Sequence, residues 1–132
     1  HFVPRYGQWK STVVRLGGLI GPDRAPGRFL AGRHDLPQGN APVNLVHLTD
    51  VVGVLSSILE HGAWGHTFNV CADKHPLRRD FYPAAAQYLK LESPTFKNET
   101  DVSGKTIDSS LVRSILPYQF QHDDVLAALP FC

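Results

Sequence analysis

Residues 12–22 read Thr-Val-Val-Arg-Leu-Gly-Gly-Leu-Ile-Gly-Pro, and this stretch decides the fold class of the chain. Its β-branched and aliphatic residues predict a strand over residues 12–20. Because apolar side chains occupy both faces of Val13, Val14 and Leu16, we expect a strand covered on both sides, as in a parallel sheet. The residues Gly17-Gly18 would let another backbone or a ligand come close, and Gly21-Pro22 predicts the end of the strand.

Strand and helix signals alternate after this stretch. A short helix is expected with Pro26 in its first turn and Gly32 at its end. Residues 43–48 predict a second strand, and either Thr49 or Asp50 could then cap a helix that stops near Gly62. Residues 67–71 predict a third strand.

The C-terminal third continues the pattern. Apolar spacing predicts a helix within residues 75–91, in which Pro83 requires either a later start or a kink. A short strand is expected at residues 105–108, followed by a helix through Leu116 and a last turn through Leu129. The caps expected for these two elements are Asp108 or Ser109, and Asp123 or Asp124. This order of elements predicts an α/β fold with parallel pairing.

Composition excludes several classes of partner. The chain has 132 residues, the size of one domain, and is 42% hydrophobic and 19% charged, which is typical of a globular protein. Its formal net charge is +1 and its basic residues form no stripe, so neither nucleic acid nor an anionic membrane is an expected partner. No apolar run reaches the roughly 18 residues that a membrane span requires.

The N-terminus begins His-Phe-Val-Pro-Arg and lacks both a methionine and the apolar core of a signal peptide, which fits a processed or excised piece. We treat residues 1–11 as an N-terminal extension. The only cysteines are Cys71 and Cys132, so a reducing, cytoplasmic setting is expected, with a bridge between the two as the alternative. The seven histidines show no zinc-ligand spacing, and no metal site is expected.

Four motifs, in order, resemble those of the NAD-dependent epimerase/dehydratase family, the extended and atypical short-chain dehydrogenase/reductases. Residues 14–22 resemble the sixth strand of that family, and Val-His-Leu-Thr-Asp-Val at residues 46–51 is similar to its I-H-V-x-D-V. Residues 67–70 look like its Y-N-V strand, and residues 105–110 like its D-x-S-K segment. Residues 70–78 resemble the L-C-A-D-x-H-P-x-R stretch of the atypical branch.

The resemblance implies that residues 12–132 form the C-terminal half of such a protein. They would supply the last strands of a Rossmann-like parallel sheet and a small α/β lobe on the substrate side. The parent would use NAD or NADP and a small-molecule substrate. The chain has no G-x-G-x-x-G turn between a strand and a helix, so we expect no cofactor to bind it alone.

Two groups of candidate site residues follow from the resemblance. Gly18, Ile20, Gly21 and Pro22 would face the nicotinamide and substrate at the carboxyl end of the strand, where open α/β sheets bind ligands. The alternative is a tight turn with close packing. Tyr6 and Lys10 match the Tyr-x-x-x-Lys spacing of the catalytic pair, but the long helix that should follow them is missing, so no catalytic residue is assigned.

The candidate substrate-binding residues are Arg24, Arg28, His47 and Arg78. Arg side chains suit anionic groups, although the alternative is a solvated helix face for Arg24 and Arg28 and surface exposure for Arg78. For His47 the alternative is a backbone hydrogen bond beneath the site. Relatives that act on nucleotide sugars usually carry an Arg shortly before this His, whereas residues 43–46 here are Val-Asn-Leu-Val, which puts such a substrate in doubt.

Two functional hypotheses remain. In the first, the chain is the substrate-side part of an NAD(P)-dependent epimerase- or reductase-like protein and is inactive alone. In the second, it is a non-catalytic interaction domain of the same fold that self-associates. Because an unpaired edge strand seeks a partner, we expect either the missing N-terminal half or a second copy to cover it.

Overall fold

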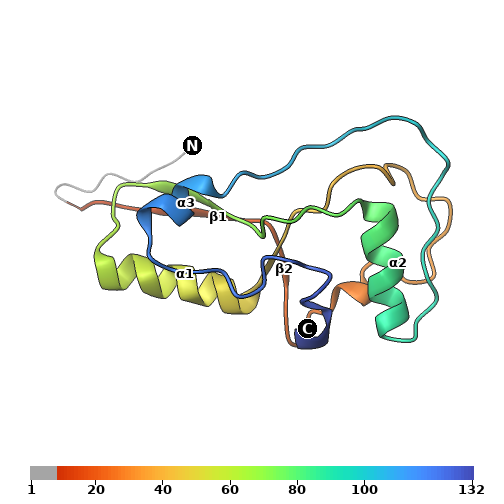
Figure 1. Ribbon diagram of the computed structural model, residues 1–132, viewed down its shortest axis with the longest axis horizontal. Coiled ribbons are helices and arrows are strands. Elements are labelled where there is room, and N and C mark those ends of the chain that lie inside the picture. The colour runs from red at the N-terminus through yellow and green to blue at the C-terminus, as the bar shows by residue number, and fades with distance from the viewer. Residues whose placement is uncertain (1–8) are drawn as a thin grey trace.

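A computed structural model of the chain describes residues 9–132, and it divides the decisive stretch into two strands (Figure 1). Strand β1 (Val13–Leu16) pairs in parallel with β4 (Thr67–Val70), whereas β2 (Gly18–Ile20) pairs in parallel with β3 (Leu45–His47). The single strand predicted over residues 12–20 is therefore wrong. The break falls at Gly17, whose N–H donates to the Val70 carbonyl before the N–H of Gly18 turns to the Asn44 carbonyl.

Close packing explains the glycine at the second of these positions. A Cβ on Gly18 would lie 2.7 Å from Cδ2 of Leu45, so the buried Leu45 side chain would have to shift to admit a side chain there. The parallel α/β fold class is confirmed, with the sheet in two narrow parts.

Helix α1 (Leu48–His61) connects β3 to β4 and ends at the C-cap Gly62, close to the predicted boundary. Its buried residues pack with the apolar face of β1 and β4 into one hydrophobic cluster, which includes Val54, Ile58, Phe68 and Val70. The expectation that Thr49 or Asp50 caps this helix is wrong. The cap is His47, whose ring nitrogen accepts from the N–H of Thr49.

A second cluster joins β2 to helix α2 (Arg78–Tyr88) and to the C-terminal segment. It contains Ile20, Leu45, Phe81 and Val125 among others. Helix α2 starts at Arg78 and keeps Pro83 inside, so the predicted later start did not occur. The short helix expected at Pro26 is a single 3-10 turn, η1 (Pro26–Arg28), which lies against α2.

Residues 105–108 form no strand, contrary to the prediction. Side-chain bonds hold this segment instead, because Asn44 donates from Nδ2 to the Lys105 carbonyl at 2.7 Å and accepts at Oδ1 from the N–H of Ile107 at 2.7 Å. Figure 1 shows the long connection from α2 to helix α3 (Ser110–Ile115) running along the outside of the molecule.

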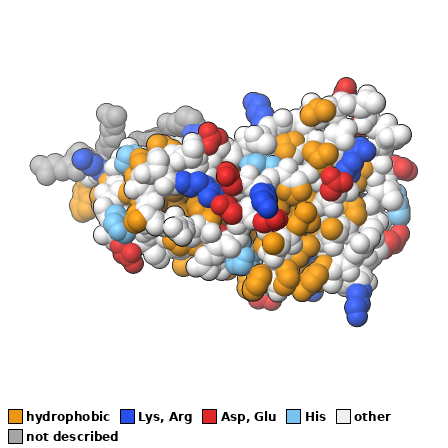
Figure 2. Space-filling model, viewed as in Figure 1, with side chains coloured by type: hydrophobic (Ala, Val, Ile, Leu, Met, Phe, Trp, Pro, Cys, Tyr) orange, Lys and Arg blue, Asp and Glu red, His pale blue; other side chains and the backbone are white. Residues whose placement is uncertain are grey.

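The chain ends in a turn over residues 124–128 and the 3-10 helix η2 (Leu129–Phe131). Asp124 caps the turn as predicted, since its Oδ1 accepts from the N–H groups of Leu126 and Ala127. This C-terminal segment lies between α1 and α2, where hydrophobic side chains gather on the face shown in Figure 2. None of the helices within residues 9–132 is long and apolar enough to cross a membrane.

Candidate functional site

Strands β2 and β3 end side by side and define one edge of the structure. Ile20 and His47 are partners in the parallel register, so the residues that follow each strand meet at the same edge. Gly21-Pro22 follows β2, and the first turn of α1 follows β3. Open α/β sheets bind ligands outside the carboxyl ends of their strands. We therefore take this edge as the candidate site.

The corner at Gly21 requires glycine for two reasons. Its φ is +152°, a backbone conformation that side chains rarely adopt. A Cβ there would also lie 3.0 Å from Cβ of Leu48 and 3.8 Å from Nε2 of His47. The corner therefore sits directly against the start of α1.

The four predicted cofactor-binding residues have unequal access. Ile20 is fully buried in the core and Gly21 is buried, whereas Gly18 and Pro22 are exposed. The packing alternative holds for Gly18, which fits against Leu45. Their contact with a nicotinamide remains a prediction.

The three predicted arginines do not converge on this edge. Arg24 donates from Nε to the Leu19 carbonyl at 2.9 Å, and its guanidinium lies 5.4 Å from the ring centroid of Phe29. Arg28 ends the η1 turn, and Arg78 opens α2 with its guanidinium near the rings of Tyr82 and Phe96. None of the three lines the pocket described below. Anion binding by these residues remains a prediction.

His47 is 2% exposed and makes two hydrogen bonds to backbone. Because the N–H of Thr49 can only donate, Nδ1 of His47 accepts it at 3.1 Å. Nε2 then carries the proton and donates to the Phe131 carbonyl at 2.9 Å. Both ring nitrogens are thus engaged within the protein, which matches the alternative of a backbone-bonded histidine beneath the site.

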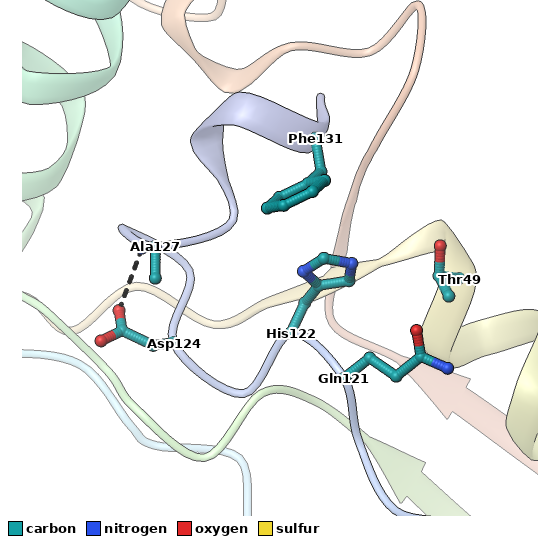
Figure 3. A pocket seen from close by; sticks show the side chains of 6 residues that line it. All are labelled: Thr49, Gln121, His122, Asp124, Ala127 and Phe131. Atoms are coloured by element: carbon teal, nitrogen blue, oxygen red, sulfur yellow. Dashed lines mark hydrogen bonds between the residues drawn. The ribbon is translucent and has the colours of Figure 1, made fainter.

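A pocket of about 570 Å³ opens beside His47, between the start of α1 and the C-terminal segment. Figure 3 shows its lining, in which the rings of His122 and Phe131 face each other, with the Thr49 and Gln121 side chains on one side and Asp124 and Ala127 on the other. Ring centroids are 4.1 Å apart for His47 and His122, and 5.0 Å apart for His122 and Phe131. The ring of His122 therefore contacts both His47 at the predicted edge and Phe131 in this pocket.

Asp50 fixes the position of His122. The carboxylate is fully buried and accepts from the hydroxyl of Tyr118 at 2.8 Å and from the N–H groups of Gln121 at 2.7 Å and His122 at 3.0 Å. A buried carboxylate is stable only with such partners. Burial, followed by the hydrogen bond to Asp50, raises the pKa of Tyr118 well above that of a free phenol.

The electrostatics of the pocket favour an uncharged imidazole. Burial lowers the pKa of His122, and the neighbouring His47 lowers it further, whereas the charge of Asp50 opposes the shift. The side chain is therefore neutral at pH 7 and can both donate and accept a hydrogen bond.

An ion pair also holds the C-terminal segment on the sheet. Arg113 bonds both carboxylate oxygens of Asp123, at 2.6 Å each, and also donates to the Cys71 carbonyl at 3.2 Å. Its guanidinium lies 3.9 Å from the ring centroid of Phe120. Cys71 itself is a buried free thiol, so the alternative of a bridge to Cys132 is not formed, and burial raises the pKa of Cys71 to about 11.

Sequence reasoning missed the pocket residues Gln121, His122 and Phe131. They follow no motif, and only the structure shows that they meet α1. The sequence did single out Asp50, in the His-Leu-Thr-Asp motif, but only as an expected helix cap. Instead, the Asp50 carboxylate accepts hydrogen bonds from the backbone N–H groups of Gln121 and His122 in the C-terminal segment.

No model of a protein family matches the sequence. The chain is similar to Protein YeeZ of Escherichia coli strain K12, with 46% identity over 115 residues. This match covers 86% of the chain and 42% of YeeZ, so the chain spans less than half the length of this relative.

Solved structures share the fold at low identity. A functionally unknown conserved protein from Silicibacter pomeroyi superposes with a TM-score of 0.71 and 21% identity, over 90% of this chain and 48% of its own. The human epimerase family protein SDR39U1, solved with NADPH, superposes with a TM-score of 0.69 and 19% identity, over 95% of this chain and 48% of its own. UDP-glucose 4-epimerase from Thermotoga maritima, solved with UDP-glucose, superposes with a TM-score of 0.68 and 19% identity, over 92% of this chain and 44% of its own.

The chain has the fold of half an epimerase-type protein. The resemblance found in the four motifs is thereby confirmed at the level of the Rossmann-like fold. The two sheets described here have two strands each, whereas a Rossmann-like fold has a parallel sheet of more strands. The small size of these sheets therefore fits a chain that spans half of such a fold.

Proposed function

We propose that this chain forms the substrate-side part of an NAD(P)-dependent epimerase- or reductase-like protein. The observation that supports this most strongly is the position of the pocket at the carboxyl ends of β2 and β3, next to the Gly21-Pro22 corner. The structural neighbours add support, because SDR39U1 is solved with NADPH and the Thermotoga protein with UDP-glucose.

In this proposal the chain binds and orients the substrate, and the rest of the parent holds the dinucleotide. Gly18, Ile20, Gly21 and Pro22 shape the wall toward the nicotinamide. His47 supports that wall from beneath, while Arg24, Arg28 and Arg78 lie outside the pocket and act, at most, at its approach. The chain alone is inactive, since it lacks a pyrophosphate-binding turn.

Calorimetric titration of NADH and NADPH tests this division. We expect no binding to the chain alone and micromolar binding by full-length YeeZ. Mixing the chain with the part of YeeZ that lies outside the matched 115 residues should restore binding. Gly21→Val is the matched variant, because it strains the corner and should weaken the restored binding. Micromolar binding by the chain alone would contradict the division, and so would failure of both YeeZ and the mixture.

A second function, self-association, is favoured by one surface. Leu48, Val52, Leu55 and Leu59 are 40%, 54%, 43% and 68% exposed and recur at helical spacing along one face of α1. Among the described strands, β1 also pairs only with β4 and leaves one edge open. Such a surface suits either the remainder of the parent or a second copy.

Sedimentation equilibrium separates these occupants. A second copy predicts a dimer in the micromolar range that Val52→Lys with Leu59→Lys disrupts, whereas Val102→Lys, at a position 86% exposed and outside this face, leaves it intact. A monomer at about 100 μM, roughly the upper concentration at which a specific weak dimer forms, would exclude self-association and leave the parent as the occupant.

A further inference from the structure

A second cavity, which we call the Glu60 pocket, lies between α1 and the segment that follows α3. Its volume is about 330 Å³, at the lower end of the range for ligand sites. Its lining side chains come from these two elements: Ser56, Ser57, Glu60, His61, Pro117 and Tyr118. It shares no residue with the lining of the pocket at His122, so it is a separate site.

The ring of Tyr118 forms a fixed wall of the Glu60 pocket. It rests directly on Gly53 of α1, where any side chain would run into the ring. Its hydroxyl donates to the buried carboxylate of Asp50 at 2.8 Å, which holds the ring in place. Such a ring is a favourable neighbour for a cation, because it does not have to be ordered when the cation binds.

The Glu60 pocket has negative charge and no positive side chain to balance it. Glu60 is exposed, and its carboxylate makes no ion pair with any described residue. Neither lysine nor arginine lines the pocket. The last turn of α1, in which Glu60 lies, adds the partial negative charge of a helix C-terminus. The pocket therefore favours a cationic ligand.

The other polar side chains of the pocket can accept hydrogen bonds. Nδ1 of His61 lies 2.9 Å from the Ser57 carbonyl, which can only accept, so Nδ1 carries the proton. Nε2 of the neutral ring is then an acceptor, and no described residue bonds to it. The hydroxyl of Ser56 is likewise unengaged among the described residues. A planar cation with several N–H groups fits this set of acceptors better than a single ammonium does.

We propose that the Glu60 pocket binds the guanidinium group of an arginine side chain carried by a protein partner. The carboxylate of Glu60 pairs with the guanidinium, His61 and Ser56 accept further N–H groups, and the ring of Tyr118 packs against the planar cation. This inference goes beyond the proposed function, because it concerns neither the cofactor nor the substrate.

The surface of α1 beside the pocket indicates a protein as the source of the guanidinium. Val52 and Leu59 are 54% and 68% exposed. They share a helix face with Ser56 and Glu60, because residues three and four positions apart are neighbours on a helix surface. A partner segment that covers these two apolar side chains therefore has its arginine next to the pocket.

Two probes of the same shape test the requirement for charge. N-acetyl-arginine amide and N-acetyl-citrulline amide, whose side chain is uncharged, are titrated at low salt into the isotope-labelled chain, and chemical shifts are followed by NMR. We expect the arginine probe to shift the signals of His61 and Ser56 with roughly millimolar affinity. The citrulline probe should bind at least about tenfold more weakly, and N-acetyl-lysine amide at least about threefold more weakly.

Glu60→Gln is the matched variant. It removes the charge at an exposed position and keeps the size of the side chain, so the fold should persist. We expect at least about a fivefold loss of affinity for the arginine probe. Glu92→Gln makes the same change at an exposed carboxylate outside the lining and should leave the affinity unchanged.

A peptide, N-acetyl-Leu-Ala-Ala-Arg amide, tests the source of the guanidinium. For a protein partner, we expect it to bind at least about threefold more tightly than the arginine probe, and Leu59→Ser should remove this gain. Equal affinity of the peptide and the arginine probe would overturn the assignment to a protein. Equal binding of arginine and citrulline overturns the proposal itself, as does the absence of shifts at His61 up to about 20 mM arginine probe, well above a millimolar Kd.

Discussion

The N–H of His122 donates to Oδ2 of Asp50 at 3.0 Å, a contact that joins residues 72 positions apart. It makes the carboxylate in the first turn of α1 the anchor of the C-terminal segment, together with the bonds from Gln121 and Tyr118. The pocket exists only while this anchor holds, because α1 supplies Thr49 and the segment supplies the other lining residues.

Replacing Asp50 should therefore loosen the pocket and lower stability. Asp50→Ala leaves two backbone N–H groups without their acceptor and leaves the hydroxyl of Tyr118 with only the Thr49 carbonyl at 3.5 Å, and we expect a loss of about 2–4 kcal/mol. Urea unfolding measures the loss, with Asp101→Ala at an exposed position as the control. An unfolding free energy within about 0.5 kcal/mol of the parent chain, the usual range of surface substitutions, would show that Asp50 is not the anchor.

The contact between Gly53 and Tyr118 predicts that Gly53→Ala changes stability in opposite directions with and without the Tyr118 ring. A Cβ on Gly53 would run into the ring of Tyr118, so Gly53→Ala should cost about 1–3 kcal/mol through overpacking. In a Tyr118→Ala background the same change should stabilise the helix by up to about 1 kcal/mol, because alanine is the better helix former.

A double-mutant cycle measured by urea unfolding tests this reversal. The Gly53→Ala change should destabilise only the chain that carries Tyr118. If its effect has the same sign and size in both backgrounds, the ring is not what requires glycine at this position.

The sequence predicts the elements whose periodicity is local. The apolar face of α1, its end at Gly62 and strand β4 all follow from residues within each element. The division of residues 12–20 does not, because the change of partner at Gly17 depends on where β3 and β4 lie. Likewise, residues 105–108 have strand-like composition, but Asn44 from another segment satisfies their backbone groups.

In the candidate site too, the sequence predicts features that depend on neighbouring residues but not contacts between distant segments. The Gly21-Pro22 corner and His47 were predicted in positions that the structure places at one edge. The roles of Asp50 and His122 could not be predicted, since their bond joins residues that are 72 positions apart in the sequence. Three arginines suggested an anion site by chemistry alone, yet the lining of the pocket contains none of them.

The lowered pKa of His122 predicts a pH dependence of stability. A histidine whose folded pKa lies below its unfolded value, about 6.5, binds fewer protons when folded. Its contribution is present above pH 6.5 and is lost as the pH falls toward the folded pKa. Asp108 and Asp124 have lowered pKa values, so their contributions are lost only below about 4, outside this window.

Urea unfolding at pH 7.5 and pH 5 should accordingly show a lower free energy at pH 5. His122→Gln should reduce this difference. The NMR titration of the His122 ring should have its midpoint below 6.5. A midpoint at or above 6.5 would mean that Asp50, the opposing influence, dominates burial.

Thiol reactivity offers a test of the junction between the sheet and the C-terminal segment. Cys71 is fully buried, and its pKa of about 11 against an ordinary 9.0 corresponds to roughly 100-fold less thiolate at neutral pH. In the Cys132→Ser chain, alkylation at pH 7.5 should then proceed only through opening of the structure. Arg113→Ala should accelerate it about tenfold or more, because loss of the bonds to Asp123 and to the Cys71 carbonyl loosens the structure around Cys71. Lys105→Ala, at an exposed position away from this ion pair, should leave the rate unchanged. Rapid labelling of Cys71 in the chain that retains Arg113 would show that the segment does not seal this part of the core.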